Sequence, residues 1–110
     1  MGCLESRTET LYRKKADLFD EIRALQFGIQ LDTRVYYRIE RGLLFYGNLE
    51  QKMKRTGFNY HLYSRVKTTL TKLKKREEIV SVRLERLTLL ITEADRTLRT
   101  VQEELDSQVL

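Results

Sequence analysis

The 110-residue sequence predicts an all-α protein, a long antiparallel two-helix hairpin of the coiled-coil type. Three observations support this prediction. Two series of thirteen positions each alternate spacings of three and four residues, which is the heptad pattern of a coiled coil. A glycine-containing turn signal separates the two series, and the sequence contains no proline that would break a helix.

The first series of core positions lies in the first half of the chain and is mostly aliphatic. It consists of Leu11, Lys15, Leu18, Ile22, Leu25, Ile29, Asp32, Tyr36, Ile39, Leu43, Tyr46, Glu50 and Met53. The second series consists of Tyr63, Val66, Leu70, Leu73, Glu77, Val80, Leu84, Leu87, Ile91, Ala94, Leu98, Val101 and Leu105. A helix with one continuous apolar stripe must bury that stripe against another helix. Each series is therefore the natural partner of the other.

The turn is predicted at residues 56–59, where the sequence reads Thr56-Gly57-Phe58-Asn59. Glycine and asparagine tolerate the positive φ that commonly ends helices. If the chain folds back around Phe58, the two series face each other along their whole length, with Leu18 opposite Leu98 and Leu43 opposite Leu73. The predicted elements are a helix over 7–55 and a helix over 60–110, assembling into a larger helical bundle.

The first helix has weak points that leave an alternative open. Gly28, Gly42 and Gly47 each lower helix propensity, and Asp32-Thr33 offers two residues that compete as helix caps. The alternative is a three-helix bundle with a break near Asp32. The uninterrupted series of core positions across that point favours one long helix.

Some of the core positions carry charge: Lys15, Asp32, Glu50 and Glu77. A buried charge is costly, but it can fix the register of a coiled coil. Lys54 follows Glu50 at the favourable i,i+4 spacing. Arg38 and Arg41 are the candidate partners of Glu77. We interpret these charges as register devices or tolerated defects rather than as catalytic groups.

The first six residues, Met1-Gly2-Cys3-Leu4-Glu5-Ser6, predict an acylated N-terminal tail over 1–6. They match the pattern for myristoylation of Gly2 after removal of Met1. Over these six residues the chain resembles the dual-acylated N-termini of Src-type kinases and G-protein α subunits, which implies palmitoylation of Cys3. One myristoyl chain binds membranes only marginally, so the second acyl group completes the anchor. The alternative is a chance match or a cloning remnant.

Ser6 and Glu9 also form a capping box that places the helix start near Arg7.

Apolar residues outside the core positions gather in the middle of the predicted hairpin and predict a partner-binding surface. They are Phe27, Leu31, Val35, Tyr37, Leu44, Phe45, Ile79, Val82, Leu89 and Leu90. A hairpin on its own would leave much of this surface in water, where apolar patches commonly mark an interface. The expected partner is a second copy of the chain or a helical segment of another protein.

Positive charge is concentrated near the turn. The net charge is +5, and residues 47–77 contain nine basic residues against the two acids Glu50 and Glu77. This basic patch consists of Lys52, Lys54, Arg55, Arg65, Lys67, Lys72, Lys74, Lys75 and Arg76. An anionic lipid or an acidic protein is the expected partner of the patch, and a nucleic acid is a weaker alternative.

Several functional classes are disfavoured. A two-helix hairpin encloses no deep pocket, and the sequence contains no phosphate-binding loop, nucleophile elbow or metal-binding helix motif. The single cysteine rules out an internal disulfide, and His61 has no second ligand at metal-binding spacing. No apolar run approaches the roughly 18 residues of a membrane-spanning helix, and the start lacks a secretory signal. We therefore expect no enzymatic activity, no cofactor and no metal.

The sequence thus predicts a lipid-anchored helical adaptor or scaffold, peripheral to the cytoplasmic face of a membrane. Its apolar surface would bind partner helices and its basic patch would contact an acidic surface. The alternatives are a nucleic-acid-binding hairpin that uses the basic patch and a structural coiled-coil subunit of a larger complex.

Overall fold

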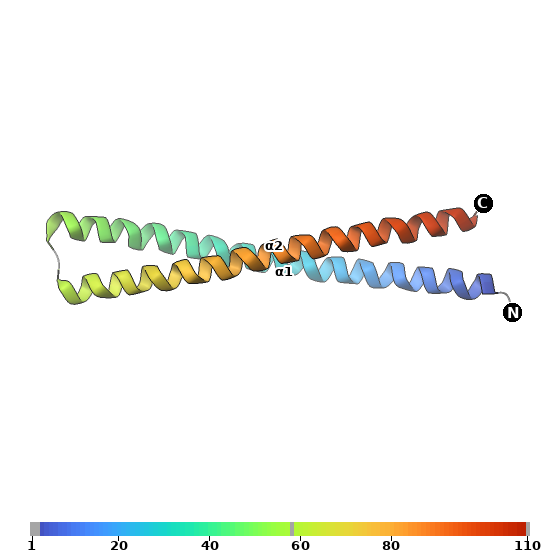
Figure 1. Ribbon diagram of the computed structural model, residues 1–110, viewed down its shortest axis with the longest axis horizontal. Coiled ribbons are helices and arrows are strands. Elements are labelled where there is room, and N and C mark those ends of the chain that lie inside the picture. The colour runs from blue at the N-terminus through green and yellow to red at the C-terminus, as the bar shows by residue number, and fades with distance from the viewer. Residues whose placement is uncertain (1–2, 58, 110) are drawn as a thin grey trace. The chain divides into compact units, whose positions relative to one another are not determined.

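A computed structural model shows the protein as two long helices, and it describes residues 3–57 and 59–109 (Figure 1). Helix α1 spans Cys3–Thr56 and helix α2 spans Tyr60–Val109. The all-α helical hairpin is confirmed. The three-helix alternative is not supported, because α1 continues through Asp32 without a break. α1 also begins earlier than Arg7, the start that the capping box indicated.

The connection between the helices uses the residue types that predicted it. Gly57 has a φ of 76°, in the left-handed region that glycine adopts without a steric penalty. Asn59 caps α2, because its side-chain oxygen accepts hydrogen bonds from the backbone N–H groups of His61 and Leu62, at 2.9 and 3.4 Å. The carbonyl of Asn59 accepts the N–H of Tyr63 at 3.0 Å, which is the first backbone hydrogen bond of α2.

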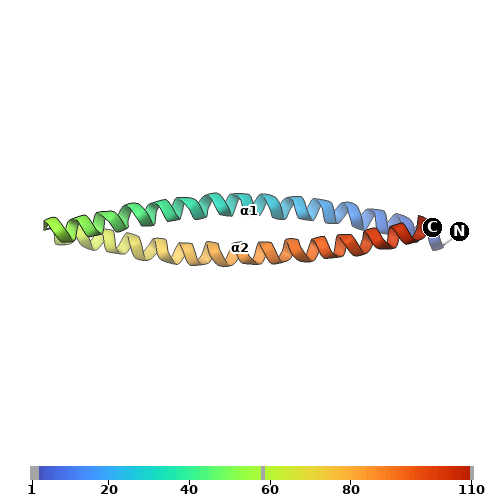
Figure 2. The ribbon, with the colours of Figure 1, turned by 90° about the horizontal axis from the view of Figure 1, so that it is seen from above.

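The chain divides into two compact units, each built from a segment of both helices. Unit 1 consists of Met1–Gln30 and Arg86–Leu110, and unit 2 consists of Leu31–Glu85. Within each unit the two helix segments lie side by side and run in opposite directions (Figures 1 and 2). Unit 2 therefore contains the turn and the whole basic patch.

The core of unit 1 is a cluster of apolar residues from both helices. It comprises Leu11, Leu18, Ile22, Ala94, Val101 and Leu105, with Leu98 packed against it. The hydroxyl of Thr8 donates a hydrogen bond to the side-chain oxygen of Gln108 at 2.7 Å. Thr8 and Gln108 are equally far from Phe58 in the sequence, as are Leu11 and Leu105. The predicted register therefore holds in this unit.

The core of unit 2 follows the same register. Ile39, Met53, Val66 and Val80 are buried there. A β-carbon added to Gly42 would lie 3.2 Å from Cδ1 of Leu73, so the helices approach closely beside the predicted pair of Leu43 and Leu73. In both units every predicted core position is buried or half-buried, and none is exposed.

Candidate functional site

The predicted partner-binding surface is largely exposed. Nine of its ten residues are exposed, between 38% and 67%, while Val35 is half-buried. Unit 2 contributes Leu31, Val35, Tyr37, Leu44, Phe45, Ile79 and Val82, and unit 1 contributes Phe27, Leu89 and Leu90. We call the six exposed members of this set in unit 2 the outer apolar surface: Leu31, Tyr37, Leu44, Phe45, Ile79 and Val82.

The outer apolar surface is best developed on α1. Tyr37, Leu44 and Phe45 are 62%, 67% and 62% exposed. Tyr37 and Leu44 are seven residues apart and thus on one side of the helix, where they line a shallow depression of about 610 Å³ with Glu40 and Arg41. The ring of Phe45 contacts the half-buried ring of Tyr46 edge to face, with centroids 5.1 Å apart. This contact supports one edge of the surface from the core.

On α2, the exposed residues of the predicted surface in unit 2 are Ile79 and Val82, which are three residues apart. In unit 1, Tyr12 and Phe19 are also exposed, although they are not among the residues of the predicted partner-binding surface. Their signal was available, since they are seven residues apart and directly follow the core positions Leu11 and Leu18. They lie outside the middle of the hairpin, to which the predicted surface was confined.

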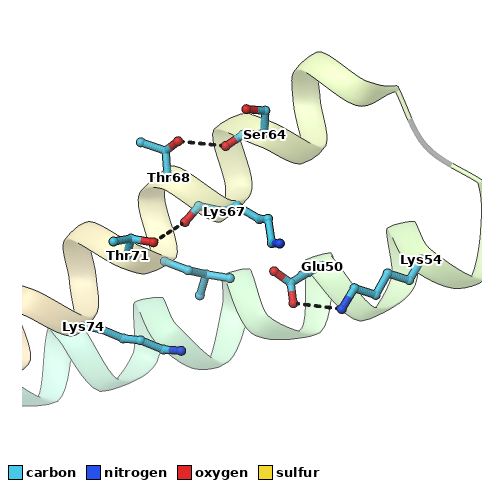
Figure 3. A pocket seen from close by; sticks show the side chains of 8 residues that line it. Glu50, Lys54, Ser64, Lys67, Thr68, Thr71 and Lys74 are labelled. Carbon is cyan, nitrogen blue, oxygen red and sulfur yellow. Dashed lines mark hydrogen bonds and ion pairs between the residues drawn. The ribbon is translucent and has the colours of Figure 1, made fainter.

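The structure brings three residues of the basic patch together in one groove of unit 2. Lys54 comes from α1, and Lys67 and Lys74 come from α2. The groove has a volume of about 530 Å³ and is lined by Glu50, Lys54, Ser64, Lys67, Thr68, Leu70, Thr71 and Lys74 (Figure 3). Five members of the patch are exposed outside it: Lys52, Arg55, Arg65, Lys72 and Lys75. Arg76 lines a separate depression of about 340 Å³ with Val35, Arg38, Ile39 and Leu73.

Side chains inside this basic groove are held by a few local contacts. The carboxylate of Glu50 pairs with the ammonium of Lys54 at 3.5 Å, as the i,i+4 spacing predicted. The ammonium of Lys67 lies 5.4 Å from the ring centroid of Tyr63, within cation–π range. The hydroxyls of Thr68 and Thr71 donate to backbone carbonyls one turn earlier, at 2.9 and 3.0 Å, so their protons are already used. The lysine ammoniums are therefore the main hydrogen-bond donors of the groove.

The charged core position Glu77 has a different partner from the arginines that the sequence suggested. Its carboxyl group shares a hydrogen bond with Glu40, and this bond, together with partial burial and the charges of Glu40 and Glu78, raises the pKa of Glu77. Lys74 acts in the opposite direction. Glu40 also accepts a hydrogen bond from Tyr36, which raises the pKa of that phenol. Glu40 thus links the outer depression to the core.

Asp32 is the third charged core position with a defined partner. It forms a bidentate ion pair with Arg83 of the other helix. Nη2 and Nε of Arg83 donate to its two carboxylate oxygens at 2.8 and 3.1 Å. The Asp32 side chain is 15% exposed, and that of Arg83 is 55% exposed. The pair joins α1 to α2 inside unit 2. Lys15, in unit 1, is half-buried.

The predicted acylation site falls at the edge of what the structure describes. Gly2 lies outside the described residues, and Cys3 is the first residue of α1. Over residues 3–57 and 59–109, no group of three His, Cys, Asp or Glu side chains is placed to hold a metal ion. Neither described helix combines the length and apolar character needed to cross a membrane.

Comparison with models of known protein families, with characterised proteins and with solved structures finds no match to this chain.

Proposed function

We propose that the protein is a non-enzymatic, lipid-anchored helical adaptor that binds partner helices through its outer apolar surface. The observation that carries this proposal is the exposure of Tyr37, Leu44 and Phe45 on a continuous helix whose core positions are already filled. Apolar side chains that contribute nothing to the hairpin core are free to be buried by a partner. Aromatic residues at such positions supply large contact areas at interfaces.

The arrangement of the outer apolar surface suits a helical partner. Tyr37 and Leu44 are two helical turns apart, and the depression between them is also lined by Glu40 and Arg41. An amphipathic helix laid along α1 would bury its apolar residues there and place polar residues against Glu40 and Arg41. A second copy of the chain or a segment of another protein meets this requirement.

The membrane component of the proposal rests on Gly2 and Cys3. A myristoyl and a palmitoyl group together give stable anchoring, which a single chain does not. The basic patch adds attraction to the anionic lipids of the cytoplasmic leaflet. Together these features support the proposal of a peripheral position on the cytoplasmic face of a membrane.

Two measurements test this function. In cells fed an alkyne analogue of myristate, the wild type should be labelled and sediment with membranes, whereas Gly2→Ala should be unlabelled and remain in the supernatant. A photoreactive phenylalanine analogue at position 44 should crosslink to one defined protein or to a second copy. The same analogue at the exposed polar position Glu21 is the control. An unlabelled wild type, or identical crosslinking at both positions, would contradict the proposal.

The basic patch keeps nucleic-acid binding as a second candidate. Nine basic residues accompany Tyr60, which is 73% exposed and available for stacking on a base. Nucleic-acid binding through phosphates would weaken steeply as salt is raised. Tight, salt-sensitive binding of an oligonucleotide by a chain that never reaches the membrane would favour this function over the adaptor. A protein with neither activity would be a structural coiled-coil subunit.

A further inference from the structure

Three lysines that are scattered in the sequence converge on the basic groove of unit 2. Lys67 and Lys74 are seven residues apart on α2 and extend from the same side of that helix, and Lys54 reaches the groove from α1 (Figure 3). Ser64 also lines the groove from α2. The groove therefore presents several positively charged donors over a short distance.

The positive charge of the groove is only partly neutralised. Glu50 is its single acidic residue, and this carboxylate is paired with Lys54. Across the described part of the chain, neither Lys67 nor Lys74 forms an ion pair. Among the residues that line the groove, three ammoniums face one carboxylate, and outside the lining the carboxyl group of Glu77 interacts electrostatically with Lys74. Two of the ammoniums are available without breaking an existing pair.

The chemistry and the size of the groove define the ligand class. Lysine ammoniums bind phosphate groups as point charges, without the planar geometry that arginine requires. A volume of about 530 Å³ is typical of sites for small molecules rather than for polymers. We infer that this groove binds a compact anion with several phosphate groups, namely an inositol phosphate, either free or as the headgroup of a polyphosphoinositide. This inference rests on the proposed attraction of the basic patch to an anionic surface and gives that attraction a specific ligand.

Glu50 has a distinct part in this site. Its carboxylate occupies the groove and competes with an incoming phosphate for Lys54. Neutralising Glu50 should therefore strengthen binding of the phosphate ligand, whereas neutralising a lysine of the groove should weaken it. Opposite effects from two residues of the same groove separate a defined site from general electrostatic attraction.

The test measures binding of inositol 1,4,5-trisphosphate to the full-length, unacylated chain by isothermal titration calorimetry. The double variant Lys67→Gln/Lys74→Gln should lose affinity by about tenfold or more. The matched control is Lys72→Gln/Lys75→Gln, which removes the same charge from exposed positions of the same helix outside the groove. The control should change affinity by less than about threefold, and Glu50→Gln should increase it. Circular dichroism melts verify that all variants fold.

Equal losses in the two double variants would show binding by diffuse charge and overturn the site, as would absence of binding by the wild type. A second arm identifies the source of the ligand. It compares vesicles containing phosphatidylinositol 4,5-bisphosphate with phosphatidylserine vesicles of equal total charge. Preference for the first supports the site with a lipid headgroup as its ligand, and binding of the soluble compound alone supports it with a free inositol phosphate. Because this experiment needs neither acyl chains nor a partner, it can fail while the adaptor function holds, and the reverse is equally possible.

Discussion

At the scale of single residues, the contact between Glu40 and Glu77 makes the hairpin sensitive to pH. The folded protein raises the pKa of Glu77, chiefly through the hydrogen bond to Glu40. The folded state therefore binds a proton more tightly than the unfolded chain does. The resulting stabilisation is complete below the ordinary carboxyl pKa of 4.5 and is lost as pH rises through the raised value. Near neutrality the two carboxylates repel each other.

Replacement of Glu77 by glutamine should raise the thermal melting temperature at neutral pH, because the amide mimics the protonated carboxyl. The increase should shrink below pH 4.5, where the wild type is itself protonated. Circular dichroism melts across this range measure the effect. Glu78→Gln, an exposed neighbour, is the control and should give a smaller increase with a weaker pH dependence. An increase of the same size at every pH would show that the carboxyl pair is not its cause.

The ion pair of Asp32 and Arg83 predicts an asymmetric response to mutation. Arg83→Met leaves a half-buried carboxylate without its partner and should lower the free energy of unfolding by about 1 kcal/mol, since Arg83 is itself largely exposed. Asp32→Leu removes the charge from the core position and should be close to neutral or stabilising. Arg83→Lys should fall between wild type and Arg83→Met, because lysine cannot make the two-pronged contact. Urea unfolding gives these values, and an Asp32→Leu variant less stable than Arg83→Met would refute the interpretation.

At the scale of the helices, the glycines of α1 differ in their surroundings. A β-carbon on Gly47 would meet nothing within 4 Å, whereas one on Gly42 would press on Leu73 at 3.2 Å. Alanine is a better helix former than glycine by about 0.5–1 kcal/mol. Gly47 thus lowers the stability of α1 without a compensating contact, and Gly42 permits the close approach of the two helices.

This contrast gives a paired prediction. Gly47→Ala should raise the free energy of unfolding by about 0.5–1 kcal/mol. Gly42→Ala should gain less or lose stability, because Leu73 must shift by a few tenths of an ångström. Both values are available from urea unfolding of the purified chain. A larger gain for Gly42→Ala than for Gly47→Ala would mean that the helices are not in close contact at Leu73.

At the scale of the whole chain, the apolar residues that form the hairpin core are separate from those of the outer apolar surface, on which the proposed association depends. The core positions stabilise the hairpin, while Leu44 and Phe45 are more than 60% exposed and contribute little to it. The double variant Leu44→Gln/Phe45→Gln should therefore keep the melting temperature of the wild type and lose partner binding or self-association. Sedimentation velocity and co-purification measure this loss. The control Tyr12→Gln/Phe19→Gln changes exposed apolar residues of unit 1 and should retain association through the outer apolar surface. A fall in melting temperature in the first variant would instead assign Leu44 and Phe45 to the hairpin itself.

The core and the turn were predictable because each depends on local rules. Heptad spacing decides which side of a helix is apolar, and glycine with asparagine marks where a helix ends and the next begins. The partners of the charged core residues were not predictable in the same way. Arg83 belongs to neither core series, and Glu40 became the partner of Glu77 in place of the expected arginines. Both contacts depend on how far a long side chain reaches across the helices.

The outer apolar surface was predictable by subtraction, since an apolar residue outside the core positions of a two-helix hairpin has nowhere else to be buried. The basic groove was not. In the sequence, Lys67 and Lys74 directly follow the core positions Val66 and Leu73, and Lys72 and Lys75 follow none, but this spacing does not tell which charges of the other helix lie opposite. Heptad periodicity and the turn signal are properties of the amino-acid order alone, so together they dictate the helices, their register and their apolar cores. Which charges from two different helices meet in one groove depends on the distance and rotation between those helices, and only the packed structure supplies these.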